Sequence, residues 1–327
     1  MTPRDPAVSA LLEPVPLVPN LASDRALSHP GRWWLAARPK TLPAAATPVL
    51  VGTACAHAAG SVPPLPALAA LAGALALQVA ANFANDVFDF EKGADTAARL
   101  GPLRAVQAGL ISPRAMRVGL FSVLALALGI GVYLALVAGP IVVVLGVASI
   151  LAALAYTGGP YPLGYHGLGD VCVFVFFGLV AVAGTCFVEL GRVTELAWFS
   201  AVPIGTLTTA ILVVNNVRDA ETDRAAHKHT LAVRFGVTFG IFEYHALLAA
   251  AYLVPLALWA QRLLSAWAVL PSLSLPLALD LSRRIRRERG AALNGVLAHT
   301  ARLLLVFGVL LGAAILLGHP AWPASSP

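Results

Sequence analysis

The chain has 327 residues, of which 58% are hydrophobic and only 12% are charged. Soluble globular proteins carry about 25% charged residues, so this composition excludes a soluble domain and indicates a polytopic membrane protein. The net charge of +6 comes from basic residues that border apolar runs rather than from one basic face, which argues against a nucleic-acid partner.

The chain divides into three parts by composition. Residues 1–32 are polar and Pro-rich, lack the pattern of a cleaved signal peptide, and are expected to be flexible. Residues 33–318 hold all the long apolar runs and are predicted to form a single transmembrane domain, followed by a short tail at 319–327. The three cysteines lie inside apolar runs without ligand spacing, so packed thiols are favoured over a disulfide or a zinc site.

A membrane-spanning helix needs about 20 mainly apolar residues. The apolar runs predict an all-α membrane protein with about nine transmembrane helices. Ser112 and Pro113 are typical of a helix start, and Pro271 and Pro276 interrupt the eighth run. The predicted spans are 42–60, 65–88, 115–138, 140–157, 167–188, 197–217, 237–260, 264–281 and 300–318.

The basic residues indicate the orientation. With nine spans, all but two of the 22 Lys and Arg residues fall on one face of the membrane, the exceptions being Arg192 and Arg262. Because cytoplasmic loops are enriched in Lys and Arg, the N-terminus and the loops after the second and sixth spans are predicted to be cytoplasmic. Trp33 and Trp34 are typical of an interfacial anchor.

Two polar clusters lie at the predicted cytoplasmic ends of the second and sixth spans. Helical offsets of three, four and seven place side chains on one face, so each cluster forms a stripe, and the two stripes can face each other across a cavity. The first stripe consists of Asn82, Asn85, Asp86 and Asp89, and the second stripe consists of Asn215, Asn216, Asp219 and Asp223.

These residue types point to metal and phosphate chemistry. Mg²⁺ prefers carboxylate and water oxygens and often bridges carboxylates to the phosphates of a substrate, while Arg and Lys bind phosphate directly. Cations follow each stripe, namely Arg104 after the first and Arg218, Arg224 and Lys228 in or after the second. A site of this kind beside hydrocarbon suits a prenyl diphosphate, which has a polar head and an apolar tail.

Two other interpretations of the stripes remain open. The Asp and Asn residues would cap helices and pair with neighbouring Arg in a purely structural role. Alternatively, intramembrane acids relay ions in transporters, although transporter sites usually lie near the midplane on interrupted helices rather than at one boundary.

Four separated stretches resemble the UbiA superfamily of membrane prenyltransferases. Residues 82–104 (NFANDVFDFEKGADTAARLGPLR) resemble its first signature and residues 215–236 (NNVRDAETDRAAHKHTLAVRFG) its second, and residues 38–53 resemble its first span. Residues 156–185 (YTGGPYPLGYHGLGDVCVFVFFGLVAVAGT) are similar to the branch that prenylates 1,4-dihydroxy-2-naphthoate in menaquinone synthesis.

The resemblance implies nine helices around a central cavity and a Mg²⁺-dependent site. It implies a catalytic, metal–diphosphate set of Asn82, Asn85, Asp86, Asp89, Asn216, Asp219 and Asp223, of which Asn82, Asp86, Asp89, Asp219 and Asp223 would hold the metal. Asp95, Arg104, Arg218, Arg224 and Lys228 would bind diphosphate, and Tyr156 and Asp170 would lie on the acceptor side. The loop after Tyr156 either covers the cavity or is a tight interhelical turn.

The resemblance further implies the reaction and its setting. A polyprenyl diphosphate and 1,4-dihydroxy-2-naphthoate would react in the bilayer with loss of CO₂ and diphosphate to give demethylmenaquinone, in a bacterial cytoplasmic (inner) membrane and without an obligate protein partner. Asp170 stands where Glu is more usual, and His227 and His229 flank Lys228 where a small residue and often Arg are expected. Another aromatic acceptor, such as 4-hydroxybenzoate or homogentisate, therefore stays open.

Overall fold

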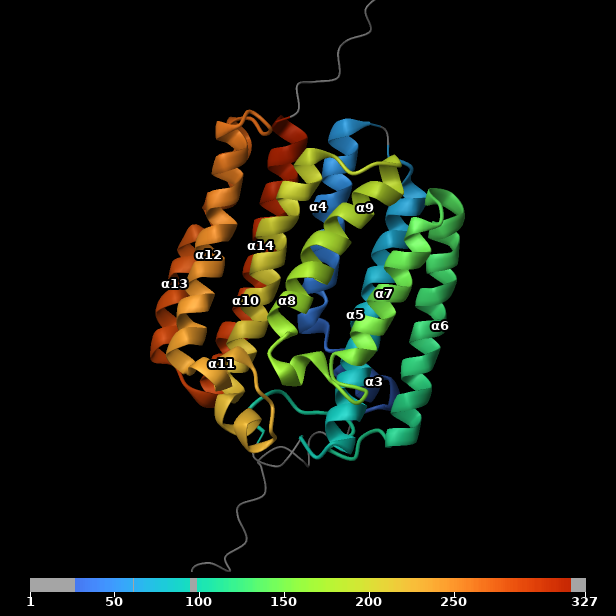
Figure 1. Cartoon of the computed structure of the whole chain (residues 1–327), viewed down its shortest axis with the longest axis vertical. Coiled ribbons are helices and arrows are strands. Elements are labelled where there is room, and N and C mark those ends of the chain that lie inside the picture. The colour runs from blue at the N-terminus through green and yellow to red at the C-terminus, as the bar shows by residue number, and fades with distance from the viewer. Residues whose placement is uncertain (1–26, 61, 95–98, 319–327) are drawn as a thin grey trace, which may run out of the picture.

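The computed structural model describes residues 27–60, 62–94 and 99–318, and these ranges contain helices and loops but no strand. The long helices run side by side along one axis and form a single bundle (Figure 1). The all-α prediction is confirmed. The proposed tail at 319–327 and all but the last residues of the proposed flexible segment 1–32 lie outside the described residues.

Nine helices of the described residues correspond in order to the predicted spans. They are α4 (Pro43–Ala59), α5 (Pro64–Glu91), α6 (Pro113–Ala138), α7 (Ile141–Ala155), α9 (Ala181–Leu190), α10 (Glu195–Ala225), α12 (Val237–Ala260), α13 (Leu275–Arg287) and α14 (Leu293–Gly318). The shorter elements are α3 (His29–Ala37), η2 (Pro39–Thr41), η3 (Leu163–His166), α8 (Gly169–Val173), the π-helical η4 (Phe174–Val180), α11 (Leu231–Phe235), η5 (Ala266–Ser274) and η6 (Gly290–Ala292). The fifth of the nine helices, α9, continues the shorter α8 and η4.

Fewer than nine of the described helices meet the length and apolar composition that a membrane span requires. In the described part of the chain, six helices are long and apolar enough to cross a membrane, and a seventh arises if the pair 29–41 and 43–59, bent by 53°, counts as one span. Helix α7 has only 15 residues. The eighth region divides between Ser274 and Leu275 into η5 and the Arg-rich α13, and Pro276 lies in the first turn of α13. The count of nine stays a prediction.

Local capping chemistry sets several helix starts. The Ser112 hydroxyl accepts a hydrogen bond from the Ala115 amide at 3.2 Å, and Pro113 occupies the first turn of α6. This confirms the helix start predicted from the Ser-Pro pair, because a side-chain acceptor satisfies an amide that has no partner inside the helix. The Thr194 hydroxyl caps α10 in the same way by accepting from the Ala197 amide at 3.1 Å.

Helix α10 is the central helix of the bundle, and most of its residues are buried. It meets η4 at two glycines. A Cβ atom added to Gly178 would lie 2.7 Å from the Gly205 Cα atom and 3.0 Å from the Ala201 carbonyl oxygen. Only glycine permits this close approach of two backbones, as is common where membrane helices pack. The contact fixes the stretch 169–190 against the helix that carries the second stripe.

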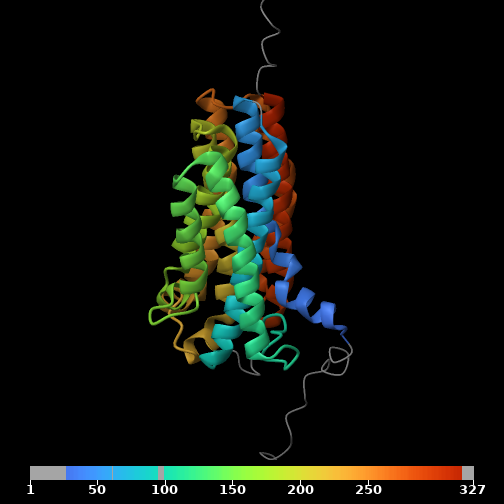
Figure 2. The same cartoon turned by 90° about the vertical axis from the view of Figure 1, so that its right-hand side faces the viewer.

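Helix α3 leaves the bundle sideways near the end that carries the first stripe (Figure 2). The Trp33 ring occupies a notch at Gly119 on α6, where an added Cβ would lie 2.4 Å from the ring, and it meets Phe83 edge-on with centroids 5.4 Å apart. Trp34 is 65% exposed. One tryptophan therefore ties α3 to the bundle, while the other faces outward, as expected of an interfacial anchor.

The glycine contact between η4 and α10 predicts a stability effect. We expect Gly178→Ala to destabilise the protein by about 1–3 kcal/mol, because rigid backbone atoms surround the new methyl group. The melting temperature of the purified protein measures this. Gly129→Ala on α6 is the matched control, because nothing lies within 4 Å of its added Cβ. An equal melting temperature for Gly178→Ala and the parent protein would contradict the close-packing argument.

Candidate active site

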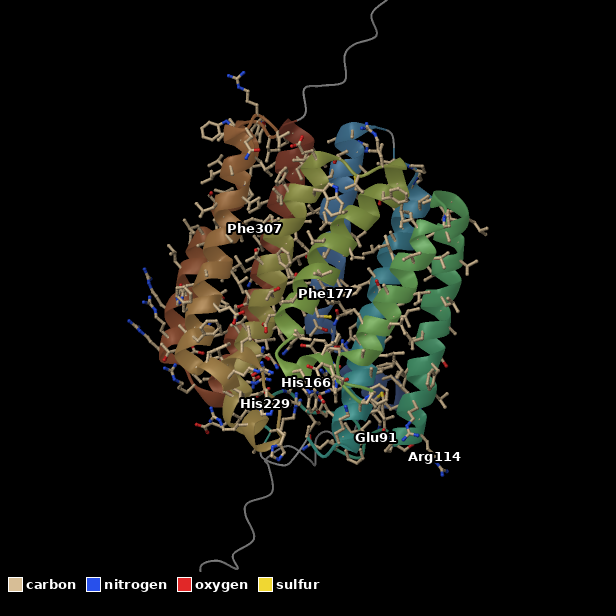
Figure 3. All side chains as sticks on the ribbon, in the orientation of Figure 1. Glu91, Arg114, His166, Phe177, His229 and Phe307 are labelled. Carbon is tan, nitrogen blue, oxygen red and sulfur yellow. The ribbon has the colours of Figure 1, made fainter. Side chains whose placement is uncertain are left out.

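A cavity of about 550 Å³ lies among α4, α5, α6, α7, α9 and α10. Its lining is polar at one end, where both stripes and the loops after them meet, and apolar toward the middle of the bundle. The polar end lies in the lower half of the molecule, close to the labelled residues His166 and His229 (Figure 3). A cavity of this size with one polar end suits an amphiphilic ligand.

Three members of the first stripe line the cavity on α5: Asn82, Asn85 and Asp89. The Asn82 amide donates to the Ala37 carbonyl oxygen at 2.9 Å and to the Thr41 hydroxyl at 3.0 Å, which ties α5 to the α3–η2 turn. Asn85 accepts a hydrogen bond from the Thr157 hydroxyl at 3.0 Å. The helical spacing therefore brings these side chains to one face, as predicted.

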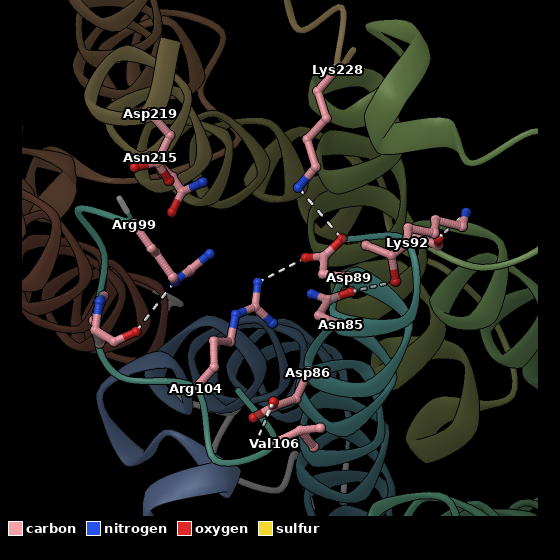
Figure 4. Close-up of polar contacts among 12 residues, drawn as sticks. Asn85, Asp86, Asp89, Lys92, Arg99, Arg104, Val106, Asn215, Asp219 and Lys228 are labelled. Carbon is pink, nitrogen blue, oxygen red and sulfur yellow. Dashed lines mark hydrogen bonds and ion pairs between the residues drawn. The ribbon is translucent and has the colours of Figure 1, made fainter. Parts of the chain in front are cut away.

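Asp86 does not line the cavity. Its two carboxylate oxygens accept hydrogen bonds from the backbone amides of Ala105 at 3.0 Å and Val106 at 3.1 Å, as Figure 4 shows for Val106. The side chain is 1% exposed. In this structure Asp86 anchors the loop that carries Arg104, and it is not positioned with the other carboxylates that the sequence assigned to a metal.

Asp89 is the centre of a buried charge network (Figure 4). One oxygen lies 2.8 Å from the Arg104 guanidinium. The other accepts from the Tyr165 hydroxyl at 2.8 Å and lies 3.4 Å from the Lys228 ammonium. A carboxylate buried beside hydrocarbon is costly unless it is paired, and Arg104 and Lys228 supply the opposite charge here. The network joins the first stripe to the loop after the second.

The second stripe lines the opposite wall from α10. The Arg218 guanidinium holds both oxygens of Asp219, at 2.8 and 2.5 Å, and also contacts Asn215 at 2.6 Å and Asn294 at 2.8 Å. Asn216 and Asp223 are buried and line the same cavity. Among the residues that the structure describes, none makes a hydrogen bond to the carboxylate of Asp223, which leaves its two oxygens available for a ligand.

The donor chemistry of this end fits Mg²⁺. Every candidate donor is a carboxylate or amide oxygen, the type that Mg²⁺ prefers. In the described part of the chain, however, no group of three His, Cys, Asp or Glu is arranged to hold an ion. Asp89 is paired with Arg104 and Lys228, and Asp219 with Arg218. An anionic ligand that attracts these cations would release the carboxylates.

The predicted cations are distributed unevenly. Arg104, Arg218 and Lys228 line the cavity, whereas Arg224 is exposed and does not. Asp95 lies outside the described residues. Arg38 and Arg99, which sequence reasoning did not assign to the site, also line the cavity.

The loop between α7 and α8 closes one side of the polar end. Tyr156 lines the cavity, as predicted for the acceptor side, whereas Asp170 is buried outside the lining with one oxygen atom that has no partner in the described structure. Lys92, just after α5, donates to the Thr157 carbonyl oxygen at 2.6 Å. Partial burial lowers the pKa of Lys92, Asp89 opposes this shift, and Lys228 adds to it.

Tyr165 is the residue of this loop that the sequence analysis missed. Its hydroxyl reaches Asp89, and two lysines approach its ring. Its place within the stretch 156–185 was the available signal, but the spacing of single residues in a loop does not reveal which side chain turns inward.

The apolar part of the cavity reaches the outer surface of the bundle. Small residues of α5 such as Gly73 and Ala74 line it, together with Gly146 of α7 and Gly184 of α9. Leu128 and Val143 also line it, yet they are 55% and 51% exposed. The cavity lining therefore includes residues of α6 and α7 whose apolar side chains are exposed on the exterior of the bundle.

Residues 45–304 match the profile of the UbiA prenyltransferase family. The chain is 39% identical over 289 residues to a protein of Mycobacterium tuberculosis named 1,4-dihydroxy-2-naphthoate octaprenyltransferase, covering 88% of this chain and 98% of the relative. It is 38% identical over 303 residues to the Escherichia coli protein of the same name, with the same coverage.

Solved structures share the fold at lower identity. A UbiA homologue from Archaeoglobus fulgidus bound to GPP and Mg²⁺ superposes with a TM-score of 0.64 at 15% identity, covering 87% of this chain and 99% of the homologue. A second structure of an Archaeoglobus fulgidus UbiA homologue, bound to DMAPP and Mg²⁺, gives a TM-score of 0.63 at the same identity and coverage. These likenesses establish the fold.

The Asp86 anchor predicts a local change in dynamics. We expect Asp86→Ala to speed hydrogen exchange at the Ala105 and Val106 amides by about tenfold or more, because hydrogen bonds to a charged acceptor contribute about 1.5–3 kcal/mol. Exchange followed by mass spectrometry on the peptide spanning 101–111 measures this. Asp223→Ala is the control, since Asp223 holds no loop amide. Unchanged protection in Asp86→Ala would contradict the anchoring role.

Proposed function

The chain belongs to the UbiA prenyltransferase family, and we propose that it transfers a polyprenyl group from a polyprenyl diphosphate to 1,4-dihydroxy-2-naphthoate in menaquinone biosynthesis. The observation that carries this proposal is the cavity itself, which joins a cation- and carboxylate-lined end to an apolar lobe. Relatives at 38–39% identity over 88% of the chain carry the name of this activity.

The reaction needs diphosphate to leave the first carbon of the prenyl group. Arg104, Arg218 and Lys228 would bind the diphosphate oxygens and stabilise the negative charge that grows on them, since charge stabilisation in a dry site is a large part of catalysis. When bound, Mg²⁺ would neutralise further charge on the same oxygens. Asp89, Asp219 and Asp223 would hold the ion, with Asn82, Asn85 and Asn216 beside them. Two relatives in fold are bound to Mg²⁺ with a prenyl diphosphate.

Asp86, Asp95 and Arg224 have less direct places in this proposal. Asp86 would act through the loop that it anchors, because its oxygens already hold two backbone amides. Arg224 is exposed near Asp223 in sequence and would contact diphosphate only at the rim. Asp95 is retained as a sequence-based candidate for diphosphate binding.

The acceptor would enter on the Tyr156 side of the cavity. As the prenyl C–O bond breaks, the ring carbon that bears the carboxylate attacks the prenyl carbon and a C–C bond forms. CO₂ then leaves, and its bonding electrons restore the aromatic ring to give the quinol form of demethylmenaquinone. Because CO₂ departs rather than a proton from that carbon, this step needs no side-chain base. Asp170, buried behind the lining, would position the acceptor-side helix α8 rather than touch the ring.

We infer that the site faces the cytoplasm of a bacterial cell and that the protein lies in the cytoplasmic membrane. The positive-inside bias supports this orientation, because the basic loops after the first and second stripes lie at one end of the bundle. The small lining residues and the exposed apolar lining residues of α6 and α7 support contact of a prenyl tail with the bilayer.

A direct assay tests the activity. Membranes with the protein, a polyprenyl diphosphate and Mg²⁺ are expected to prenylate 1,4-dihydroxy-2-naphthoate and release CO₂, and EDTA is expected to abolish the reaction. A panel with 4-hydroxybenzoate and homogentisate identifies the acceptor. No prenylated product from any acceptor, with folded protein present, would refute the enzyme assignment.

Asp223→Asn gives the sharpest test of the metal–diphosphate set. Because the Asp223 carboxylate makes no hydrogen bond within the described structure, its replacement by an amide of the same size removes none, and we expect the turnover number to fall about 100-fold with an unchanged melting temperature. Asp280→Asn is the matched control on α13, where Asp280 is exposed and lies 3.8 Å from Arg284. Full activity of Asp223→Asn would remove this residue from the set.

Labelling from outside the cell tests the orientation. Arg114, at the start of α6, and Arg192, between α9 and α10, are both exposed. The start of α6 and the connection between α9 and α10 lie at opposite ends of the bundle (Figure 1). In intact cells we expect a membrane-impermeant maleimide to modify Arg192→Cys and to spare Arg114→Cys, whereas broken cells should show both reactions. The parent protein serves as the control, since Cys55 and Cys186 are buried and Cys172 is partly buried. The reverse pattern would place the site on the outer face.

A further inference from the structure

Tyr165 lies between two lysines at the polar end of the cavity. The Lys228 ammonium is 4.7 Å from the centroid of its ring and the Lys92 ammonium is 5.1 Å from it. Both distances fall within the range in which an ammonium is attracted to an aromatic face. Of the two lysines, only Lys228 lines the cavity.

The hydroxyl of the same residue engages the first stripe. It donates to the Asp89 oxygen that also lies 3.4 Å from Lys228. Tyr165 therefore contacts both members of one buried ion pair, through its ring on the cation and through its hydroxyl on the anion. A side chain in this place fixes the relative position of the two charges.

The backbone of Tyr165 is held independently of its side chain. The amide of His229, the residue that follows Lys228, donates to the Tyr165 carbonyl oxygen at 2.8 Å. The Arg234 guanidinium donates to the His166 carbonyl oxygen at 3.0 Å, and Lys92 donates to the Thr157 carbonyl oxygen at 2.6 Å. The loop is therefore fastened to both loops that follow the stripes, and the Tyr165 ring is held in place.

We propose that Tyr165 is a positioning residue that holds the Lys228 ammonium at the polar end, ready to move from Asp89 to an incoming diphosphate. This inference rests on the proposed function. A lysine side chain has four rotatable bonds, and ordering it costs up to about 2 kcal/mol. A fixed aromatic face that restricts the ammonium before binding lowers that cost at the moment of binding. When Lys228 moves away, the Tyr165 hydroxyl still donates a hydrogen bond to the same Asp89 oxygen. The carboxylate therefore keeps a neutral donor while it becomes available to a cation.

Binding of inorganic diphosphate to the purified full-length protein tests this role without turnover. By titration calorimetry, Tyr165→Leu is expected to bind diphosphate about tenfold more weakly than the parent, the size of effect expected of a sheltered cation–aromatic contact. Tyr165→Phe keeps the ring and is expected to stay within about threefold of the parent. Tyr161→Leu is the matched control in the same loop, because Tyr161 is 57% exposed, stacks on His166 and does not line the cavity.

A double-mutant cycle separates positioning from a general structural effect. If Tyr165 acts through Lys228, then Tyr165→Leu has no further effect on diphosphate affinity in a Lys228→Gln background, because coupled residues are not additive. A further tenfold loss in that background would overturn the proposal. So would an equal loss of affinity in Tyr161→Leu, which would show that the loop as a whole is responsible.

The remaining outcomes are also decisive. Parent-like binding by Tyr165→Leu overturns the inference and leaves the proposed function intact. No diphosphate binding by the parent protein counts against the proposed function and removes the inference with it. If Tyr165→Leu does not fold, Tyr165→Gln removes the aromatic face and keeps a hydrogen-bond donor: a tenfold loss of affinity supports the proposal, and parent-like binding overturns it. A tenfold loss in Tyr165→Phe would also overturn it, because the hydroxyl rather than the ring would be responsible.

Discussion

The polar end of the cavity depends on one constraint, which is that carboxylates next to hydrocarbon need neutralising partners. Asp89 and Asp219 satisfy it with Arg104, Lys228 and Arg218. Such pairs recover only part of the cost of removing two charges from water. These ion pairs therefore contribute little to stability, but their partners can be exchanged. An anionic ligand can take the place of the carboxylates beside the Arg and Lys side chains, and a divalent cation can take the place of Arg and Lys beside the carboxylates.

The two stripes are equivalent in sequence but not in structure. On α5, Asp86 turns to backbone amides and Asp89 makes long-range ion pairs with residues 15 and 139 positions away. On α10, Asp219 is held by the adjacent Arg218, and the Asp223 carboxylate has no hydrogen bond within the described residues. The first stripe thus organises the loops, while the second presents oxygen atoms that can accept a ligand with little rearrangement.

The predictable and unpredictable parts of this molecule have different physical origins. Helix positions follow from apolar runs and from caps such as Ser112, and the cavity-facing side of α5 follows from helical spacing, so both could be predicted. The orientation of Asp86 could not, because it depends on where a loop 19 residues later returns. The inward turn of Tyr165 likewise depends on contacts with Asp89 and with residues near 229, and no periodicity encodes such contacts. The division of the eighth predicted span into η5 and α13 could not be predicted in detail, although Pro271 and Pro276 lie in that region.

The mode of attachment of the Arg104 loop has a consequence for sequence divergence. Asp86 contacts the main chain at 105 and 106, not the side chains. Every residue except proline supplies the required N–H group, so the anchor itself sets no preference among side chains of similar size at these positions. Substitutions in this segment can therefore accumulate while the Arg104 guanidinium keeps its position. Related chains can differ in the sequence of the loop and still keep the ion pair between Arg104 and Asp89.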